Sequence, residues 1–471
     1  MTAISRAAAV ILTAAPFKGQ GRARLTGLRP AVLSLAAALS FSVAGASGAL
    51  AESLTLAQAY ERMMSGEIEF EILDLERDVA AEVSRQARGA LRPRVALNFD
   101  INMVDQNVMA SDNTSYADGR SRYGTTKMEL TIRQPIYDAA RWRQMGVADA
   151  QRELTRVKAE QARNDLIAQM TDSFLDVAQA QFLVRRSGSV IRTRRDFVAM
   201  LEASREAGRA DLSTLLRAEG DILSAEGDLS EAEMERTQAL FSFARFVGGE
   251  VTAVALTDNR FGMIGSEDLR RSLTRERLFD ISPQMQIARA ELALAQKLHH
   301  RSKAGYLPTV NLSAEVGVDE TDGSLFGGGS KIRNGKVGVG IEVPLYQGGV
   351  QQSLVREEAI RVQIAERRLE LTRRLVGREF DALTAAEQRA AQRIGVLARH
   401  ASAAAEALRT VRAEEEAGRV SADVVLEREL NVETIDIEMQ VARLQQLRLQ
   451  LRLLGLFGAL DVNALSRQLN G

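Results

Sequence analysis

The segments LTIRQPIYDAAR (130–141) and VGIEVPLYQGGV (339–350) decide the fold, because they are two copies of one pattern. Each alternates apolar and polar residues up to a proline and then passes through a tyrosine into a long stretch without proline. Pro135 and Pro344 are 209 residues apart. The alternation predicts a strand, and the stretch after it predicts a helix.

A second pair of segments precedes the first pair, LRPRVALNFDINMV (91–104) and YLPTVNLSAEVGV (306–318). Pro93 and Pro308 are 215 residues apart, close to the offset of the other pair, which indicates a tandem duplication. Strands of about 10 residues with one apolar and one polar face are typical of membrane barrels. A half-buried strand on a soluble core has the same pattern.

The sequence therefore predicts two β-hairpins, at 95–136 and 309–345, with loops at 105–126 and 320–336. Four strands cannot close in lipid, because an open edge leaves backbone groups unpaired. Two chains give eight strands and an interior filled by side chains, whereas three chains give twelve strands and a channel. If the strands form a barrel, a trimer is the smallest assembly that makes a duct.

The tetrapeptide EAGR occurs twice, at 206–209 and at 416–419. About 70 residues separate each tyrosine from the next EAGR, which predicts helices of about 105 Å that end at a left-handed glycine. Return helices of about 35 residues follow, with apolar heptads typical of coiled coils. Shorter helices are predicted at about 55–90 and 283–304. Candidate caps of the return helices are Asp211 or Ser213, and Ser421 or Asp423.

The first 51 residues combine a basic segment, an apolar run and the small residues Ala-Leu-Ala, which predicts a secretory signal peptide over 1–51 rather than a membrane anchor. Its removal leaves 56 basic and 62 acidic residues, near −6, which argues against a nucleic-acid partner. The chain has no cysteine, so it has neither disulfides nor a lipid-accepting thiol.

Catalytic signals are weak. The three histidines form no metal-spaced cluster with other ligands, and FGGGSK (326–331) lacks the spacing of a phosphate-binding loop. We expect no enzyme activity, no catalytic or cofactor-binding residue, no metal site and no cofactor.

In its order of segments the chain resembles the TolC family of outer-membrane channel-tunnels, over about 52–457. The resemblance rests on the duplication, the proline-flanked strands and the glycine-marked tips. It implies a mostly α fold with a membrane β-barrel portion, in which a trimeric twelve-stranded outer-membrane barrel continues into a coiled-coil α-helical periplasmic tunnel. It also implies a homotrimer in outer-membrane lipid, a periplasmic adaptor, and an inner-membrane ABC or RND transporter.

On this interpretation the chain divides into five parts. These are the signal peptide (1–51), a first repeat (52–250, tip at 208), an equatorial linker (251–281), a second repeat (282–457, tip at 418) and a C-terminal tail (458–471). The function implied is that of an outer-membrane exit duct for type I secretion or tripartite efflux, with a large periplasmic part. The missing lipid-accepting cysteine favours secretion.

The resemblance also implies an acidic ring at the tunnel entrance, a little beyond the second tip glycine. In GRVSADVVLEREL (418–430), Glu427 matches the outer acid, and Asp423 matches the inner acid after a shift of one residue. Asp423 is equally suited to cap a helix, and Glu427 to be a solvated charge. Tip residues expected to contact the adaptor are Gly208, Arg209, Gly418 and Arg419, where Arg209 departs from the hydrophobic residue usual in the family.

Arg209 and Arg419, beside the turning glycines, could pair with acids across the tips and hold them shut, but solvated arginine side chains are the favoured interpretation. The rival from another class is a periplasmic or surface coiled-coil scaffold without a pore. It explains the helices but not four strands suited to lipid at duplicated positions.

Overall fold

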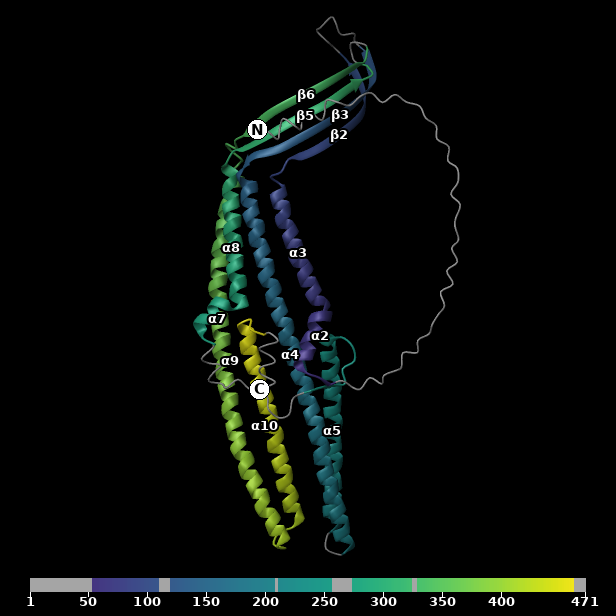
Figure 1. Ribbon diagram of the computed structural model, residues 1–471, viewed down its shortest axis with the longest axis vertical. Helices are drawn as coiled ribbons and strands as arrows, with labels where there is room; N and C mark the ends of the chain where they lie inside the picture. Colours follow the sequence, from purple (N-terminus) through teal and green to yellow (C-terminus); the bar gives the residue numbers. More distant parts are fainter. Residues whose placement is uncertain (1–52, 110–118, 208–210, 256–272, 324–327, 461–471) are drawn as a thin grey trace, which may run out of the picture. The chain divides into compact units, whose positions relative to one another are not determined.

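The computed structural model describes residues 53–109, 119–207, 211–255, 273–323 and 328–460, all within the unit Ala51–Gly471. The expected signal peptide lies outside these residues. The described part is mostly helical with one four-stranded sheet, which confirms the predicted fold class of long helices and four strands per chain (Figure 1).

The same order of elements occurs twice. The first half contains α2 (Leu56–Gly66), α3 (Ile68–Gly89), β2 (Arg94–Val108), β3 (Gly119–Asp138), α4 (Ala139–Glu206) and α5 (Leu212–Val247). The second half contains α8 (Pro283–Lys303), β5 (Thr309–Thr321), β6 (Ser330–Glu342), α9 (Val350–Glu416) and α10 (Ala422–Leu456). Between and before them lie β1 (Ser53–Leu54), β4 (Ala253–Val254) and α7 (Arg275–Ile281).

One predicted helix is two helices. The helix expected over 55–90 is interrupted at Glu67, whose backbone is extended (φ −80°, ψ 116°). Thr55 and Gln58 form a capping box at the start of α2, and Glu67 caps α3 through the backbone N–H of Glu69. The preceding Gly66 weakens helix continuity at this point. The prediction of a single helix was therefore wrong.

The strands also extend further than predicted. β2 and β3 pair as far as Val108 and Gly119, and β5 and β6 as far as Thr321 and Ser330. Polar pairs continue the ladder there, such as Lys331 Nζ to Glu320 Oε2 at 2.7 Å. The apolar alternation marked only the part with an apolar face, so the predicted loops at 105–126 and 320–336 were too long.

The sheet is antiparallel in the order β2-β3-β5-β6, so β2 and β6 are its edges. The helices adjoining the strands follow the same order: α3 packs on α4, α4 on α8, and α8 on α9. Beyond them, α4 pairs with α5 and α9 with α10 as long hairpins, and α10 also packs on α4 (Figure 1). The molecule therefore has two flanks, β2 with α3 and β6 with α9.

The main apolar core lies where α2, α4, α5 and α10 meet beside the short pair β1–β4. Phe174 and Phe243 are fully buried there, with their ring centroids 5.7 Å apart. A smaller cluster of Leu278, Val376 and Phe457 joins α7 to α9 and α10. These cores anchor the middle of the long helices. Nearer the tips, the helices are held by contacts within each hairpin and by the packing of α10 on α4.

Candidate functional site

The first candidate site is the four-stranded sheet, whose two faces differ. The register aligns Val95, Ile132, Ala314 and Val337 in one row and Leu97, Leu130, Val316 and Gly335 in the next. The alternate face carries rows such as Asn98, Glu129, Gly317 and Asn334. The period of two read from each strand is thus continuous across the sheet, with one apolar and one polar face.

The apolar face is open. Leu97 and Phe99 are exposed by 63% and 61%, and Val337 by 77%. Toward the hairpin loops the apolar rows stop at charged residues, where Asp105 accepts hydrogen bonds from Arg120 at 2.7 Å and Arg122 at 2.8 Å. An exposed apolar band of this size on strands longer than 10 residues suits lipid.

Aromatic residues gather where the strands join the helices. The rings of Tyr137 and Trp142 meet edge to face with centroids 5.2 Å apart, and Tyr346 is 82% exposed. Aromatic rings with one polar end favour the boundary between lipid and water. Among the helices of the described ranges, none has the length and apolar character needed to cross a membrane.

The second candidate site is the tip of the α9–α10 hairpin. α9 ends at Glu416, and Gly418 adopts a left-handed backbone with φ +70°. The N–H of Arg419 donates to the Glu414 carbonyl at 2.8 Å, the six-to-one hydrogen bond that closes a helix at such a glycine. This turn reverses the chain within a few residues, and α10 begins at Ala422.

Asp423 and Glu427 lie one turn apart on the same exposed face of α10. The buried Val425 is on the opposite side of the helix. Ser421 occupies the N-cap position and makes no side-chain cap hydrogen bond, while Asp423 lies in the first turn. The structure thus leaves both carboxylates in solvent at the hairpin tip.

The tip also has charge that sequence reasoning passed over. Glu414, Glu415 and Glu416 end α9, where the helix dipole disfavours carboxylates, and no basic residue lies in this last turn. Behind the tip, Arg412 of α9 binds Glu429 of α10 at 2.6 Å. Arg419 is exposed and has no ion-pair partner among the described residues.

The first tip is only partly described. Gly208 and Arg209 lie outside the described residues, between the end of α4 and the start of α5. Asp211 is the N-cap of α5 and accepts a hydrogen bond from the Thr214 N–H at 2.7 Å. This bond and the Ser213 hydroxyl hold the pKa of the Asp211 carboxyl below its usual value. Of the predicted caps, Asp211 is the one that forms.

Charge pairs between α4 and α10 connect the two hairpins, and we call them the inter-hairpin pairs. Farther from the hairpin tips the acids are on α4 and the arginines on α10, where Arg448 binds Asp176 and lies 3.4 Å from Asp172. Nearer the tips the charges are reversed between the two helices, and Arg186 of α4 binds Asp436 of α10. The pairs favour this register of the two helices, because sliding one helix past the other would separate each charge from its partner.

A buried carboxylate lies in the seam of the α9–α10 hairpin. Glu387 is 1% exposed and accepts hydrogen bonds from the side-chain amides of Gln446 at 2.9 Å and Gln450 at 3.1 Å. The heptad pattern predicted an apolar seam, and these three polar residues at its centre were missed. Such a polar contact specifies helix register at some cost in stability.

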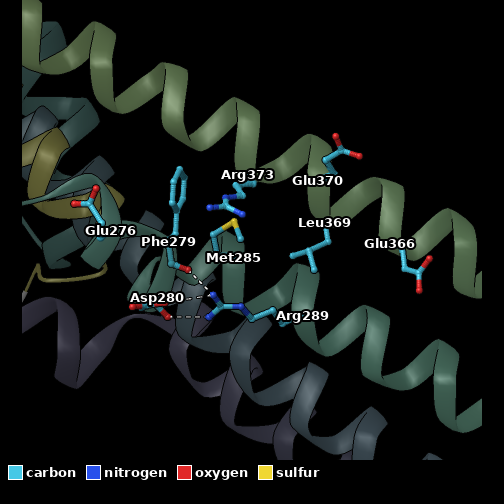
Figure 2. A pocket seen from close by; sticks show the side chains of 9 residues that line it. All are labelled: Glu276, Phe279, Asp280, Met285, Arg289, Glu366, Leu369, Glu370 and Arg373. Atoms are coloured by element: carbon cyan, nitrogen blue, oxygen red, sulfur yellow. Dashed lines mark hydrogen bonds and ion pairs between the residues drawn. The ribbon is translucent and has the colours of Figure 1, made fainter.

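Where α7 and α8 meet α9, a groove of about 610 Å³ opens to the surface (Figure 2). Arg289 donates to the carbonyls of Phe279 at 2.8 Å and Asp280 at 3.1 Å, and Arg373 lies 4.8 Å from the Phe279 ring. These contacts hold the linker helix α7 against the second repeat. Within the described ranges, no group of three or more histidine or acidic side chains is placed to hold a metal ion.

The family profile of the outer membrane efflux proteins matches residues 72–249 and 276–459, well over half of the chain. The chain belongs to the outer membrane efflux protein family. This match confirms the resemblance to the TolC family found in the sequence. As an efflux-family protein, the chain is an outer-membrane exit duct for secretion or efflux, with a large periplasmic part.

Similar proteins support the assignment of this chain to the efflux family. It is 22% identical to the proteases secretion protein PrtF of Dickeya chrysanthemi, over 81% of this chain and 83% of the relative. It is 24% identical to the outer membrane protein TolC of Vibrio cholerae, over 73% of this chain and 77% of that protein. The crystal structure of the CmeC outer membrane channel of Campylobacter jejuni aligns with a TM-score of 0.71 at 12% identity, covering 88% and 89% of the two chains.

Proposed function

We propose that three copies of this chain form one passive duct, with a twelve-stranded barrel in the outer membrane above a helical tunnel. The observation that carries the proposal is the sheet with one apolar face, one polar face and two unpaired edges, β2 and β6. In lipid these edges must pair, and joining β6 of one copy to β2 of the next pairs both. Closure places the apolar rows toward lipid and the polar rows toward the lumen.

We further propose that Asp423 and Glu427 line the tunnel entrance. A threefold axis brings three copies of each carboxylate together, together with the acidic end of α9 at 414–416. Carboxylates held close together repel one another and attract cations, which makes the entrance narrow, acidic and selective for cations. The exposed positions of both side chains on one face of α10 support this role.

The hairpin tips are the proposed contact with a periplasmic adaptor, through Gly208, Arg209, Gly418 and Arg419. The adaptor would in turn connect the duct to an inner-membrane ABC or RND transporter. PrtF is named as a protein that secretes proteases. We therefore favour a type I secretion system, with protein cargo, over drug efflux for this chain. In this proposal the duct is passive, and the energy for transport comes from the inner-membrane transporter.

Opening then requires the α9–α10 hairpin to move away from α4. Two rigid hairpins joined by separable charge pairs form a bistable contact of the kind that permits such a change. The inter-hairpin pairs and the packing of α10 on α4 hold the closed arrangement. Contact of the adaptor with the tips would favour the open one.

Reversal potentials in planar bilayers under a salt gradient test the entrance. Asp423→Asn and Glu427→Gln should each lower cation selectivity, and the double variant should lower it further. The control is Glu438→Gln, because Glu438 lies on the same exposed face of α10, about 22 Å from Asp423. Equal effects of the control and the tip variants would place selectivity elsewhere in the tunnel. Unchanged selectivity in the double variant would remove both residues from the gate.

A further inference from the structure

The duplication supplies a template for the contact between copies. Inside the chain the repeats meet along one junction, where β3 lies beside β5 and α4 beside α8. In the second repeat β6 and α9 are the equivalents of β3 and α4, and in the first repeat β2 and α3 are the equivalents of β5 and α8. We infer that β6 and α9 of one copy bind β2 and α3 of the partner subunit in the register of this internal junction. The inference rests on the proposed trimeric duct and adds its residue-level geometry.

The offsets between the repeats hold in the helices as well as at the prolines. Ser84 of α3 donates to Asp149 of α4 at 2.7 Å. Adding 215 to Ser84 gives His299 of α8, and adding 209 to Asp149 gives Glu358 of α9. These two residues also interact, because the Glu358 charge acts to raise the pKa of His299. The same two offsets therefore translate contacts of one repeat into contacts of the other.

The strand register follows first. In the internal junction Met128 pairs with Val318, Leu130 with Val316 and Ile132 with Ala314. Adding 209 to the β3 residues and subtracting 215 from the β5 residues gives the expected pairs between copies. Val337 pairs with Met103 of the partner subunit, Val339 with the partner's Ile101, and Ile341 with the partner's Phe99. Every one of these residues is on the apolar face, as the pleat requires. A slip of one residue would place apolar side chains beside polar ones.

The helices give an independent result. At the internal junction Ile287, Ala290 and Leu294 of α8 form one apolar cluster with Leu154 and Val157 of α4. The offset of 215 carries the three α8 residues to Ile72, Leu75 and Val79 of α3. These are exposed by 48%, 56% and 64% in the single chain. The translation thus selects three large apolar side chains that remain about half exposed or more in the described chain.

Their counterpart on α9 is a shallow groove of about 450 Å³. Its lining includes the apolar Ile360, Ile364 and Leu371 together with Gln363, Glu366 and Arg367. The last three are the translated positions of Leu154, Val157 and Lys158, which contact α8 inside the chain. The groove therefore lies where the template places α3 of the partner subunit.

The charges at the translated positions also fit the template. Lys158 of α4 lies 3.3 Å from Glu291 of α8. Translation carries this pair to Arg367 and Glu76 of the partner subunit, and the signs of both charges are kept. Among the described residues Arg367 forms an ion pair only along its own helix, with Glu370 at 3.1 Å, and its side chain is 84% exposed. Glu76 is exposed and has no ion-pair partner among the described residues.

Because the chain has no cysteine, engineered pairs report the register directly. Ile341→Cys with Phe99→Cys should give covalent trimers on mild oxidation in membranes, visible on a denaturing gel. Within one copy Phe99 lies in one row with Arg333 of β6, eight residues along the strand from Ile341. The two positions are therefore about 30 Å apart, too far for a disulfide. The controls are Ile341→Cys with Ile101→Cys, and Ile341→Cys with Leu97→Cys, which are displaced by two residues. Stronger cross-linking in either control would overturn the register.

The helix contact is tested by charge reversal. Arg367→Glu and Glu76→Arg should each lower the temperature at which the trimer dissociates in detergent, and the double reversal should restore it. The matched control is Lys158→Glu with Glu291→Lys at the internal junction, which should not change trimer dissociation. No rescue in the double variant would overturn the Arg367–Glu76 contact. Trimers that cross-link only in a shifted register would refute the template while leaving the duct intact, and the absence of any trimer would refute both.

Discussion

The inter-hairpin pairs yield the most quantitative prediction about gating. Replacing Arg186 and Arg448 by Met keeps their packing but removes the charges that hold α10 to α4. Their side chains are 34% and 28% exposed, so solvent screens each contact and about 0.5–1 kcal/mol per site is expected. Two sites in each of three copies give about 3–6 kcal/mol per trimer. Since 1.4 kcal/mol is tenfold, the ratio of open to closed channels should rise roughly 10² to 10⁴-fold.

Single-channel recording of the double variant Arg186→Met with Arg448→Met measures this ratio as open probability. Each single variant should give about half of the effect on a logarithmic scale, since the two sites are well separated. The control is Arg412→Met, which breaks the pair with Glu429 inside the α9–α10 hairpin and leaves the inter-hairpin pairs intact. An intact trimer whose open probability is unchanged in the double variant, or raised equally by the control, would refute the reasoning.

Three further predictions concern stability, each measured by thermal unfolding of the purified protein. Glu387→Leu should destabilise the folded protein by about 2–6 kcal/mol, because the buried amides of Gln446 and Gln450 lose their acceptor. Glu387→Gln should destabilise it less, and equal losses of stability in the two variants would contradict this. Gly418→Ala should cost about 1–2 kcal/mol since φ is +70°, whereas Gly220→Ala inside α5 should stabilise slightly; a neutral Gly418→Ala would show that the turn adapts. Burial, with the charges of Lys303 and His300, lowers the pKa of His299 below 6.5, so stability should be full above that pH and fall as pH drops below it. His299→Gln should remove this dependence, and an unchanged pH profile would assign it to other groups.

Much of the fold could be predicted from the sequence because it is repeated. The paired prolines and the alternation around them located all four strands, and the register brings their apolar residues into continuous rows. Ser282-Pro283 correctly marked the start of α8, because proline suits the first helical position. The return helices have 36 and 35 residues, close to the predicted length.

What the sequence did not reveal depends on distant contacts. The pairing of Ser53–Leu54 with Ala253–Val254 leaves no periodic signal. The break at Glu67 is an exception, because Gly66 and the cap at Glu67 are local features. The acids at 172 and 176 and the arginines at 448 and 452 have matching spacing, but only the packing of α10 on α4 makes them partners. For Asp423 and Glu427, a single chain fixes exposure but not the approach of other copies, so their role stays a prediction.

Single-channel conductance of the purified wild-type protein in planar bilayers tests the central claim most directly. A trimeric duct predicts discrete, uniform and cation-selective current steps from trimers that insert through their strands. A well-folded trimeric preparation that inserts and yet never conducts, even with the charge pairs Arg186–Asp436 and Arg448–Asp176 removed, would contradict the account and favour a scaffold without a pore.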